Sequence, residues 1–559
     1  MKLYIMSTNI RKDTSKIKKL YWGKTHEELK KMKSEIKNIY DNHIGNEGSE
    51  NLALEYYQFI FFLLLSKNRL TISKDIEEEA KRIYNNNPSE EVAEKYLFFL
   101  SILPLEKRKG TSDTALIEGQ KVYETYPNSE GIADFYFSML RMVFISSKIE
   151  ENKIYEKIYD VLTRYPLRIV NVDRLIDSLM SKFDIEEEYS GKICRLINFL
   201  AGKVKIKETL NQSKYRLLYD VNHKLTNVEL TKLLEIWSLV QKIKEHLVVK
   251  NPTKLRFGHY TSGDVLQLFL KQKEKKDKKR DNNTTDIKKY SIVTKSRLNN
   301  VNYMNDPSEG KVLDQCLGLE TINQKLSLKP SPWFLMSLTT VIDQLTMWSQ
   351  YGNHAEGVCL VLDSGDFAEV KYSSDIKWLT SSYSSERLSE ELKNSNIMSE
   401  SGSKDFIYRI GYLTTQIDEV SELKPEYNTR LNEEEIRIIN NSLSVLNERV
   451  KEIDKGKELT LFEKVDECLE EIRYLFKSAD YSYEFELRVL KYMPLEPDNS
   501  KIKIDDSGEF AKLYIERDNP IKISEVIFGP KFQNPEKVTP LLHLLDKNIK
   551  FRQSEISFR

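Results

Sequence analysis

The chain has 559 residues, which is more than one hydrophobic core supports and therefore predicts two or three domains. Hydrophobic residues make up 40% and charged residues 31%, which excludes a disordered or fibrous chain. The 86 acidic and 86 basic residues cancel, so no net charge attracts the chain to nucleic acid or a membrane. The sequence from Met1 to Lys16 lacks the apolar segment of a secretory signal, and the longest apolar run, 59–65, is too short to span a bilayer. We therefore expect a cytoplasmic protein without a membrane partner.

Cysteine and histidine spacing predicts neither a disulfide framework nor a metal site. The four cysteines contain no Cys-x-x-Cys pair. In the second half of the chain the histidines are His259, His354 and His543, which lie far apart without the spacing of metal ligands. We expect no metal cofactor.

The first half of the chain repeats with a period of 39 residues. Pro88, Pro127 and Pro166 each follow an amphipathic helical segment and precede another one. The expected helices before the prolines are 76–84, 115–123 and 155–162, and those after them are 92–103, 132–144 and 172–182. Because proline ends a helix and a single helical hairpin cannot bury its apolar face, this pattern predicts stacked hairpins.

Such a pattern resembles a tetratricopeptide-like α-solenoid, although the period exceeds the usual 34 residues. We assign this all-α helical-repeat domain to residues 1–250, where the segment KNPTK marks a boundary. The resemblance implies that the repeat binds a protein partner or trigger.

After Pro252 the sequence changes to short apolar runs separated by Gly, Pro, Asn and Asp, which predicts an α+β domain over residues 251–559. It begins with a strand that ends at His259, followed by a helix capped near Ser262. Further strands are expected in the segments PWFLMSLTT, GVCLVLD and ISEVIFGP, and a helix and a short closing strand in PEKVTPLLHLLDKNIKF.

A partly helical insertion is expected at about 373–480, and its last helix leads directly into the segment YSYEFELRVLKY, residues 481–492. As a strand, this segment places Tyr483, Phe485, Leu487 and Val489 on one face. The opposite face carries Glu484, Glu486 and Arg488. Taken alone, that polar face is either an ordinary solvated surface with an ion pair or part of a site.

Five ordered motifs resemble the bacterial family of unknown function DUF2971. They are HYTS (259–262), NDPSE (305–309), MWSQYGNHAEGVCLVLD (347–363), YEFELRV (483–489) and VIFGP (526–530). The resemblance covers about residues 255–551 apart from the insertion. It implies no activity by itself.

Three of the expected strands also look like the signature strands of ADP-ribosyltransferases: a first strand ending in His259, a middle strand with Ser337-x-Thr339, and a late strand with Glu484-x-Glu486. This resemblance implies NAD as substrate. His259 would bind a ribose, Ser337 and Thr339 would shape the nicotinamide pocket, Glu486 would be catalytic, and Glu484 would face the acceptor.

The remaining residues assigned to the NAD site by this resemblance are Tyr260, Thr261, Tyr303, Asn305, Trp348, Tyr351 and Arg488. Three tyrosines, Tyr260, Tyr303 and Tyr351, are alternative stacking partners for nicotinamide. Other interpretations stay open. Asn305, Asp306 and Glu309 either contact a ligand or belong to an ordinary Asn-Asp-Pro turn. Trp348 and Tyr351 have the spacing of helical core residues, and His259 can have only a structural role.

The combined interpretation is an NAD-consuming effector, an ADP-ribosyltransferase or NAD glycohydrolase, in a bacterial toxin or phage-defence protein whose helical repeat acts as sensor. Its acceptor would be a protein or a nucleic acid. Two alternatives use the same residues differently. One is a metal-independent nuclease with His259 as general acid or base, and the other is a non-catalytic interaction scaffold.

Overall fold

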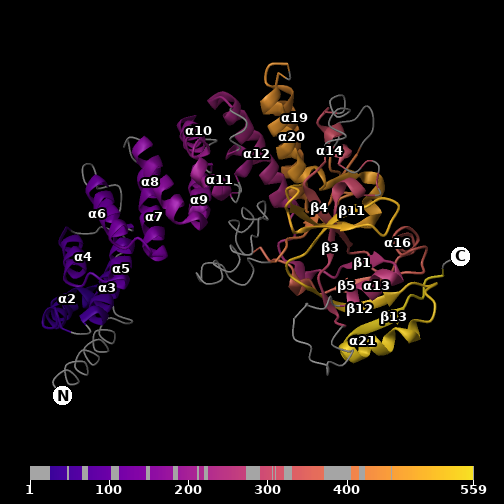
Figure 1. Cartoon of the computed structure of the whole chain (residues 1–559), viewed down its shortest axis with the longest axis horizontal. Coiled ribbons are helices and arrows are strands. Elements are labelled where there is room, and N and C mark those ends of the chain that lie inside the picture. Colours follow the sequence, from indigo (N-terminus) through magenta and orange to yellow (C-terminus); the bar gives the residue numbers. More distant parts are fainter. Residues whose placement is uncertain are drawn as a thin grey trace. The chain divides into compact units, whose positions relative to one another are not determined.

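The computed structural model describes residues 25–46, 49–65, 74–101, 112–146, 151–180, 187–210, 213, 215–219, 225–271, 290–304, 306, 308, 310–319, 330–370, 404–414, 422–454 and 456–557. The chain divides into two compact units, Met1–Val221 and Asn222–Arg559 (Figure 1).

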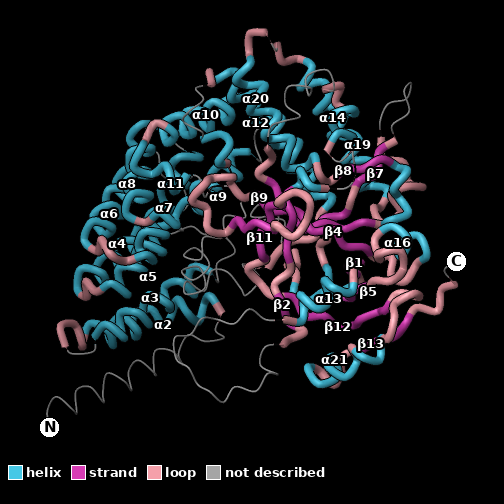
Figure 2. Tube along the Cα trace, turned by 45° about the vertical axis from the view of Figure 1, so that its right-hand side comes forward, coloured by secondary structure: helices cyan, strands magenta, loops and turns pink. Residues whose placement is uncertain are grey.

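The described part of the first unit is helical (Figure 2). Its α-helices are α2 (His26–Asp41), α3 (Ser49–Leu65), α4 (Lys74–Asn86), α5 (Glu90–Ser101), α6 (Ser112–Thr125), α7 (Glu130–Ser146), α8 (Glu151–Arg164), α9 (Ile169–Met180), α10 (Glu187–Ala201) and α11 (Lys207–Leu210). Short 3-10 helices lie at Pro166–Arg168, Val204–Ile206 and Arg216–Tyr219. The six helices predicted around the three prolines are thus present, as α4 to α9.

Alternate helices of the first unit pack side by side, with α3 against α5, α5 against α7, and α7 against α9. The intervening helices α4 and α6 pack on α5 and α7 respectively. Each helix buries an apolar stripe that no single hairpin could cover, as Val92, Leu97 and Leu100 of α5 illustrate.

The 39-residue period reappears in the hydrogen bonds of this unit. Tyr126 donates its hydroxyl to the carbonyl of Pro88, and Tyr165 donates its hydroxyl to the carbonyl of Pro127. Each of these tyrosines immediately precedes its own proline and reaches back to the proline of the preceding helix pair. Successive helix pairs therefore meet in the same register.

The second unit begins before the boundary expected from the sequence. Helix α12 (Asn227–Leu247), which the sequence analysis placed in the repeat domain, belongs to it and packs against α19 (Glu433–Lys451) and α20 (Leu459–Arg473). At this contact, buried Lys244 forms an ion pair with buried Glu471 at 3.4 Å. Helical periodicity alone cannot tell which domain a helix packs against.

The second unit contains most of its strands in one mixed sheet. They are β1 (Gly258–Thr261), β2 (Val293–Thr294), β3 (Arg297–Asn300), β4 (Trp333–Thr339), β5 (Val358–Leu362), β6 (Tyr408–Arg409), β9 (Glu486–Tyr492), β10 (Ile502–Asp505), β11 (Lys512–Glu516), β12 (Ile521–Phe528) and β13 (Lys550–Gln553). A separate parallel pair is formed by β7 (Gly411–Leu413) and β8 (Phe476–Ser478). Shorter helices are α13 (Gly263–Leu270), α14 (Lys311–Cys316), α16 (Leu345–Gln350) and α21 (Thr539–Leu545).

Along the main path the strand order is β10-β11-β3-β4-β1-β5-β12-β13, and β9 pairs with β4 and β6. The strands β1, β5, β12 and β13 are labelled in Figure 1. The pairings are antiparallel except that of β12 with β13. The strand predicted around GVCLVLD is β5, which is buried along its whole length between β1 and β12.

The strand predicted over 481–492 is wrong in its first half. Residues Ala479–Glu484 form a 3-10 helix, Phe485 adopts a left-handed conformation with φ 44°, and the strand β9 starts only at Glu486. From there the predicted alternation holds, because Leu487 and Val489 enter the main core cluster and are nearly inaccessible.

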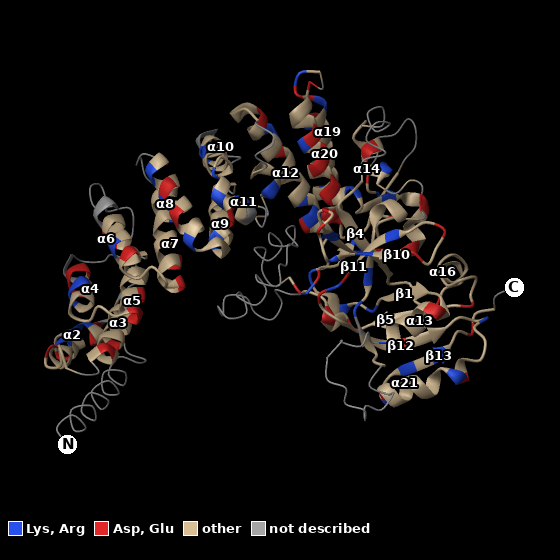
Figure 3. Cartoon of the chain, in the orientation of Figure 1, with Lys and Arg blue, Asp and Glu red and all other residues tan. Residues whose placement is uncertain are grey.

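Lys and Arg are interspersed with Asp and Glu along the helices of both units (Figure 3). Among the described helices, none is both long and apolar enough to cross a membrane.

Candidate functional site

A cavity of about 170 Å³ in the second unit is lined by most of the polar residues selected from the sequence. From that set it is lined by His259, Tyr260, Ser337, Thr339, Tyr351, Glu484, Glu486 and Arg488. The other lining residues are Gly258, Met304, Asp306, Leu338, Met347 and Lys477. Segments separated by more than two hundred positions in the sequence therefore meet in one small volume.

The cavity lies where the sheet splits along one edge of β4. On the opposite edge, β9 pairs with all of β4, from Trp333 opposite Tyr492 to Thr339 opposite Glu486. The first edge is shared by two strands, because β3 pairs at residues 334–335 and β1 only at Thr339. Within the described residues, the segment 336–338 has no strand partner on that edge, and Ser337 and Leu338 line the cavity.

His259 bridges this split with its side chain. It lies inside β1, which continues to Thr261, and not at the strand end expected from the sequence. Its Nδ1 is 2.9 Å from the carbonyl oxygen of Ser337. Since a carbonyl only accepts, Nδ1 carries the proton and Nε2 is left as an acceptor. Burial lowers the pKa of His259, although the bond to Ser337 opposes this, so the ring is neutral at pH 7.

Glu486 is a buried, ionised carboxylate. Arg488 binds it in a bidentate manner, with Nε 2.7 Å from Oε1 and Nη2 3.0 Å from Oε2. Burial by itself would raise its pKa, but the charges of Arg488 and Lys477 and hydrogen bonds from Arg488 and Ser337 outweigh burial and lower the pKa to about 2. The polar face of the strand is thus buried, which overturns the interpretation as a solvated surface: Glu486 is 6% and Arg488 1% exposed.

Glu484 enters the same cavity from the 3-10 helix and not from the strand. Thr339 donates its hydroxyl to the Glu484 carbonyl at 2.6 Å, which secures the turn at Phe485. The carboxylate accepts from the Tyr351 hydroxyl at 2.5 Å and from Lys477 at 2.8 Å. Burial raises the pKa of Glu484 and outweighs the opposing charge and hydrogen bond of Lys477. The two glutamates therefore have pKa values displaced in opposite directions.

Lys477 is a charged residue of the cavity that the sequence analysis did not select. It lies in β8, and its ammonium contacts Glu484 at 2.8 Å and Glu486 at 3.2 Å. Burial alone would lower its pKa, but the charges of the two glutamates raise it, so the lysine stays cationic. The only sequence signal was a lone lysine directly after the apolar helix that precedes the strand.

Several predicted site residues do not line the cavity. Trp348 is fully buried, its indole nitrogen donates to Asp343 at 2.8 Å, and its ring packs edge-on against Tyr260; it is a core residue and not a ligand platform. Thr261 and Tyr303 are absent from the lining. Asn305 lies outside the described residues.

The two tyrosines of the cavity differ in their freedom to contact a ligand. Tyr260 is buried, and its hydroxyl donates to the Val341 carbonyl and accepts from the Asp343 amide at 2.7 Å. Tyr351 is 38% exposed. Of these two, Tyr351 is the better placed to stack on a bound ring.

The arrangement offers a hydrogen-bond acceptor, two carboxylates of unequal acidity and a cationic pair in one cavity. A neutral imidazole and an ionised carboxylate are suited to bind hydroxyl groups and to stabilise developing positive charge. Within the described ranges, no group of three or more His, Cys, Asp or Glu side chains could hold a metal ion.

A family model described as "Protein of unknown function (DUF2971)" matches residues 347–489. The match therefore covers part of the second unit. Searches of curated proteins and of solved structures gave no match.

The stretch that matches the family model includes Tyr351, Lys477, Glu484, Glu486 and Arg488, so one wall of the cavity lies inside it. The motifs at 259–262, 305–309 and 526–530, which also suggested the family, lie outside the match. The match extends through the predicted insertion, whose described parts include β6, β7, α19 and α20.

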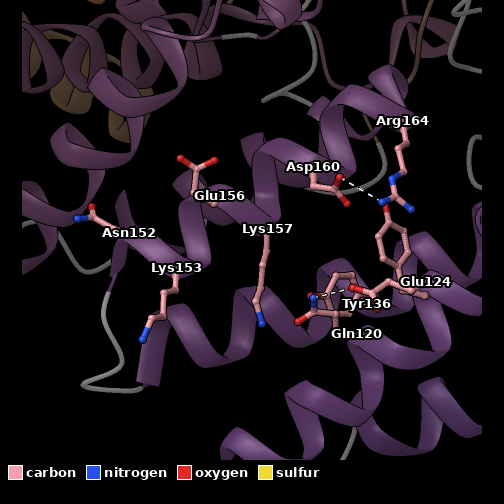
Figure 4. A pocket seen from close by; sticks show the side chains of 10 residues that line it. Gln120, Glu124, Tyr136, Asn152, Lys153, Glu156, Lys157, Asp160 and Arg164 are labelled. Carbon is pink, nitrogen blue, oxygen red and sulfur yellow. Dashed lines mark hydrogen bonds and ion pairs between the residues drawn. The ribbon is translucent and has the colours of Figure 1, made fainter.

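A second cavity, of about 510 Å³, lies in the first unit (Figure 4). Its charged side chains are largely paired: Arg164 with Asp160 at 3.3 Å, Glu124 with Gln120 at 2.7 Å, and Glu156 with Lys203 at 3.0 Å. Opposite charges balance in its wall, so its electrostatics do not select one class of ligand.

Proposed function

We propose that the cavity of the second unit binds the nicotinamide riboside half of NAD and cleaves its N-glycosidic bond. The observation that carries this proposal is the ionised Glu486, fixed by Arg488 and placed in one cavity with the neutral His259. The product is either ADP-ribose transferred to an acceptor or free ADP-ribose.

The size and charge of the cavity agree with this substrate. Pockets for drug-sized ligands have roughly 300–1,000 Å³, so a cavity of about 170 Å³ is small and takes only the reacting part of NAD, with the adenosine half outside. Asp306, Glu484 and Glu486 carry more negative charge into the wall than Lys477 and Arg488 offset. A pyridinium ring, which is cationic, suits such a wall.

The chemistry uses the two glutamates in different roles. When the bond between C1′ and the pyridinium nitrogen breaks, its electron pair goes to that nitrogen and nicotinamide leaves neutral. The positive charge that develops on the ribose is stabilised by the ionised Glu486. His259 Nε2 accepts a hydrogen bond from a ribose hydroxyl, which holds the sugar in place.

Glu484 is suited to receive a proton. Water or the acceptor attacks C1′ and loses a proton, and a carboxylate whose pKa is raised is a better base than an ordinary one. Its hydrogen bond to Tyr351 orients it. Glu484 would thus serve as general base while Glu486 stays ionised throughout.

For the first unit we propose a tetratricopeptide-like solenoid that docks a protein partner and controls the effector, as in a bacterial toxin or phage-defence protein. The repeated hydrogen bonds of Tyr126 and Tyr165 and the side-by-side packing of alternate helices support a solenoid.

A nuclease acting on phosphate fits the cavity less well. Its two cations, Lys477 and Arg488, are already paired with carboxylates, and negative charge in the wall would repel a phosphodiester. If the protein is instead a non-catalytic interaction scaffold, it has no catalytic activity for the replacement of Glu484 and Glu486 to alter.

The test is release of nicotinamide from NAD by the full-length protein, measured by chromatography, alone and with bacterial lysate as a source of triggers and acceptors. Glu486→Gln should lower the rate at least about a hundredfold, because it removes the charge that stabilises the transition state. The matched control, Glu496→Gln, changes an exposed glutamate of the same unit and should keep the wild-type rate. Absence of release in both conditions, or equal rates for the two variants, would refute the proposal.

A further inference from the structure

One lysine contacts both glutamates of the cavity, and it comes from outside the main sheet. Lys477 lies in β8, which pairs with β7 and not with the strands of the main sheet. Its ammonium is 2.8 Å from Oε2 of Glu484 and 3.2 Å from Oε2 of Glu486. A single cation therefore joins the two carboxylates to which the proposed reaction gives different roles.

The pair of β7 and β8 fixes the place of this ammonium. Lys477 stands opposite Tyr412 in the parallel pairing. The Tyr412 hydroxyl accepts a hydrogen bond from the Glu486 amide at 2.9 Å, so the two strands reach the start of β9 at two points. Lys477 is 5% exposed, which leaves its side chain little freedom to turn toward solvent. Its contacts with the glutamates are therefore part of the folded core and not those of a surface lysine.

The two glutamates differ in the partners that remain if this ammonium is removed. Arg488 holds both oxygens of Glu486, at 2.7 Å and 3.0 Å, and would stay in place. The other partner of the Glu484 carboxylate within the described residues is the Tyr351 hydroxyl, at 2.5 Å. Without Lys477, Glu486 keeps a charged partner and Glu484 keeps only a neutral one. A proton taken up by the pair would therefore go to Glu484.

Burial makes the charge of Glu484 depend on Lys477. Burial raises the pKa of Glu484, the charge of Lys477 opposes this rise more than any other neighbouring group, and the charge of Glu486 adds to it. A cation within about 4–6 Å lowers the pKa of a carboxyl group by about 1–3 units. Loss of Lys477 should therefore protonate Glu484 over a range of pH in which it is ionised in the wild-type protein.

The other ionisable groups around Lys477 and Glu484 do not replace this charge. They are Glu486 and Arg488 of β9, Tyr412 of β7, Tyr481 of the 3-10 helix 479–484, Tyr351 after α16 and Asp314 of α14. The pKa values of all three tyrosines are raised, chiefly by burial for Tyr351 and Tyr412, so they stay neutral at pH 7. Asp314 is paired with Arg473 at 3.1 Å, and Arg488 is paired with Glu486. Among the described residues, Lys477 is thus the cation that acts on Glu484.

We infer that Lys477 is a positioning residue that holds Glu484 ionised and in place beside Glu486, so that Glu484 can accept the proton of the attacking group. This inference rests on the proposed cleavage of NAD. As the water or acceptor forms its bond to C1′, its proton passes to a Glu484 oxygen. Lys477 keeps its own protons throughout and acts through the two glutamates.

The pH dependence of nicotinamide release by the full-length protein tests this role. If Glu484 must be ionised, kcat/KM falls on the acid side with the apparent pKa of Glu484. Lys477→Met should raise this apparent pKa by at least about one unit, which lowers kcat/KM about tenfold or more at pH values below both midpoints. Above both midpoints the variant and the wild type should differ by less than about threefold, because Glu484 is ionised in both. A role of Lys477 in folding alone would lower the rate by the same factor at every pH.

Lys491 provides a matched control. It is a buried lysine of β9 that also bridges two carboxylates, at 2.8 Å from Asp405 and 3.2 Å from Asp518, and it does not line the cavity. Lys491→Met removes the same kind of buried contact and should leave the apparent pKa of the acid side within about 0.3 units of the wild-type value. Equal shifts in Lys477→Met and Lys491→Met would overturn the inference.

Infrared spectroscopy measures the charge of Glu484 without turnover. The carbonyl stretch of a protonated carboxyl group grows as the pH falls, and the part due to Glu484 is the difference between a protein and the same protein carrying Glu484→Gln. The midpoint of this band should lie at least about one unit higher in the Lys477→Met background than in the wild-type background. If thermal unfolding shows that Lys477→Met is not folded, Lys477→Gln keeps a neutral donor and should shift the midpoint in the same direction.

The outcomes separate this inference from the proposed function. If NAD is cleaved but the acid side of the profile does not move in the Lys477 variants, the role of Lys477 in proton transfer is wrong and NAD cleavage stands. An unshifted infrared midpoint would show that Lys477 does not control the charge of Glu484. If no NAD is cleaved, the proposed function fails and the role in proton transfer fails with it, whereas the infrared midpoint still decides whether Lys477 keeps Glu484 ionised.

Discussion

The hydroxyl of Thr339 connects the middle strand to the turn that carries Glu484, and it can be removed without changing the shape of the side chain. Thr339 is buried, donates to the Glu484 carbonyl at 2.6 Å and accepts from the Val341 amide at 2.9 Å. Thr339→Val would leave both main-chain groups buried without that partner. At about 1–2 kcal/mol for each orphaned group, the free energy of unfolding should fall by about 2–4 kcal/mol.

The neighbouring residue offers a matched control. The Thr340 hydroxyl is buried and has no hydrogen-bond partner among the described residues. Thr340→Val therefore removes a polar atom that contributes no bond, and the free energy of unfolding should change by less than about 0.5 kcal/mol or increase.

Denaturant unfolding of the full-length protein, followed by tryptophan fluorescence, measures both variants. Trp237, Trp333 and Trp348 all lie in the second unit, so its transition dominates the signal. Equal losses of stability in Thr339→Val and Thr340→Val would refute the reasoning. If Glu484 is the proposed general base, Thr339→Val should also slow nicotinamide release, because the turn that positions Glu484 is loosened.

Three further changes test other parts of the fold. Gly529→Ala places a Cβ about 2.3 Å from the Ala355 carbonyl oxygen and should lower the thermal midpoint by several degrees, whereas Gly508→Ala, where the nearest atom is 3.8 Å away, should not. Tyr165→Phe deletes one of the repeated tyrosine bonds at an exposed position and should cost the first unit about 0.5–1.5 kcal/mol in denaturant unfolding. The pKa of Glu486 is lowered from 4.5 to about 2 on folding, so its ionisation stabilises the folded protein above pH 4.5, and this stabilisation is lost as the pH falls toward 2. In Glu486→Gln, the free energy of unfolding should therefore decline less steeply between pH 4.5 and pH 2 than in the wild type. An unchanged slope would contradict the assignment of this pKa to Glu486.

The sequence predicts that Glu486 and Arg488 lie on the same face of β9, because period-two spacing places them opposite Leu487 and Val489. The burial of that face was not. Charged side chains are mostly exposed, because removing a charge from water is unfavourable. Here partners from other parts of the chain, above all Lys477, offset the cost of burying Glu486.

Two local conformations were also beyond prediction from the sequence. A left-handed phenylalanine is rare, and Phe485 adopts this conformation in a turn held by a bond from Thr339, far upstream in the sequence. Trp348 and Tyr351 share helical spacing, yet one is fully buried and the other borders the cavity. Which side of a short helix faces solvent depends on tertiary packing.

Because β4 pairs with β9, the cavity cannot form during synthesis until β9 has been translated. Thr339 pairs with Glu486, which is synthesised 147 residues later, so β4 and β9 cannot pair before then. Closing so long a loop is slow, and the first unit can fold while the rest of the chain is still being translated. A ribosome that stops before Arg488 thus releases a chain with the helical first unit but without the complete β9 wall of the cavity. A complete cavity therefore forms only after β9 has been synthesised.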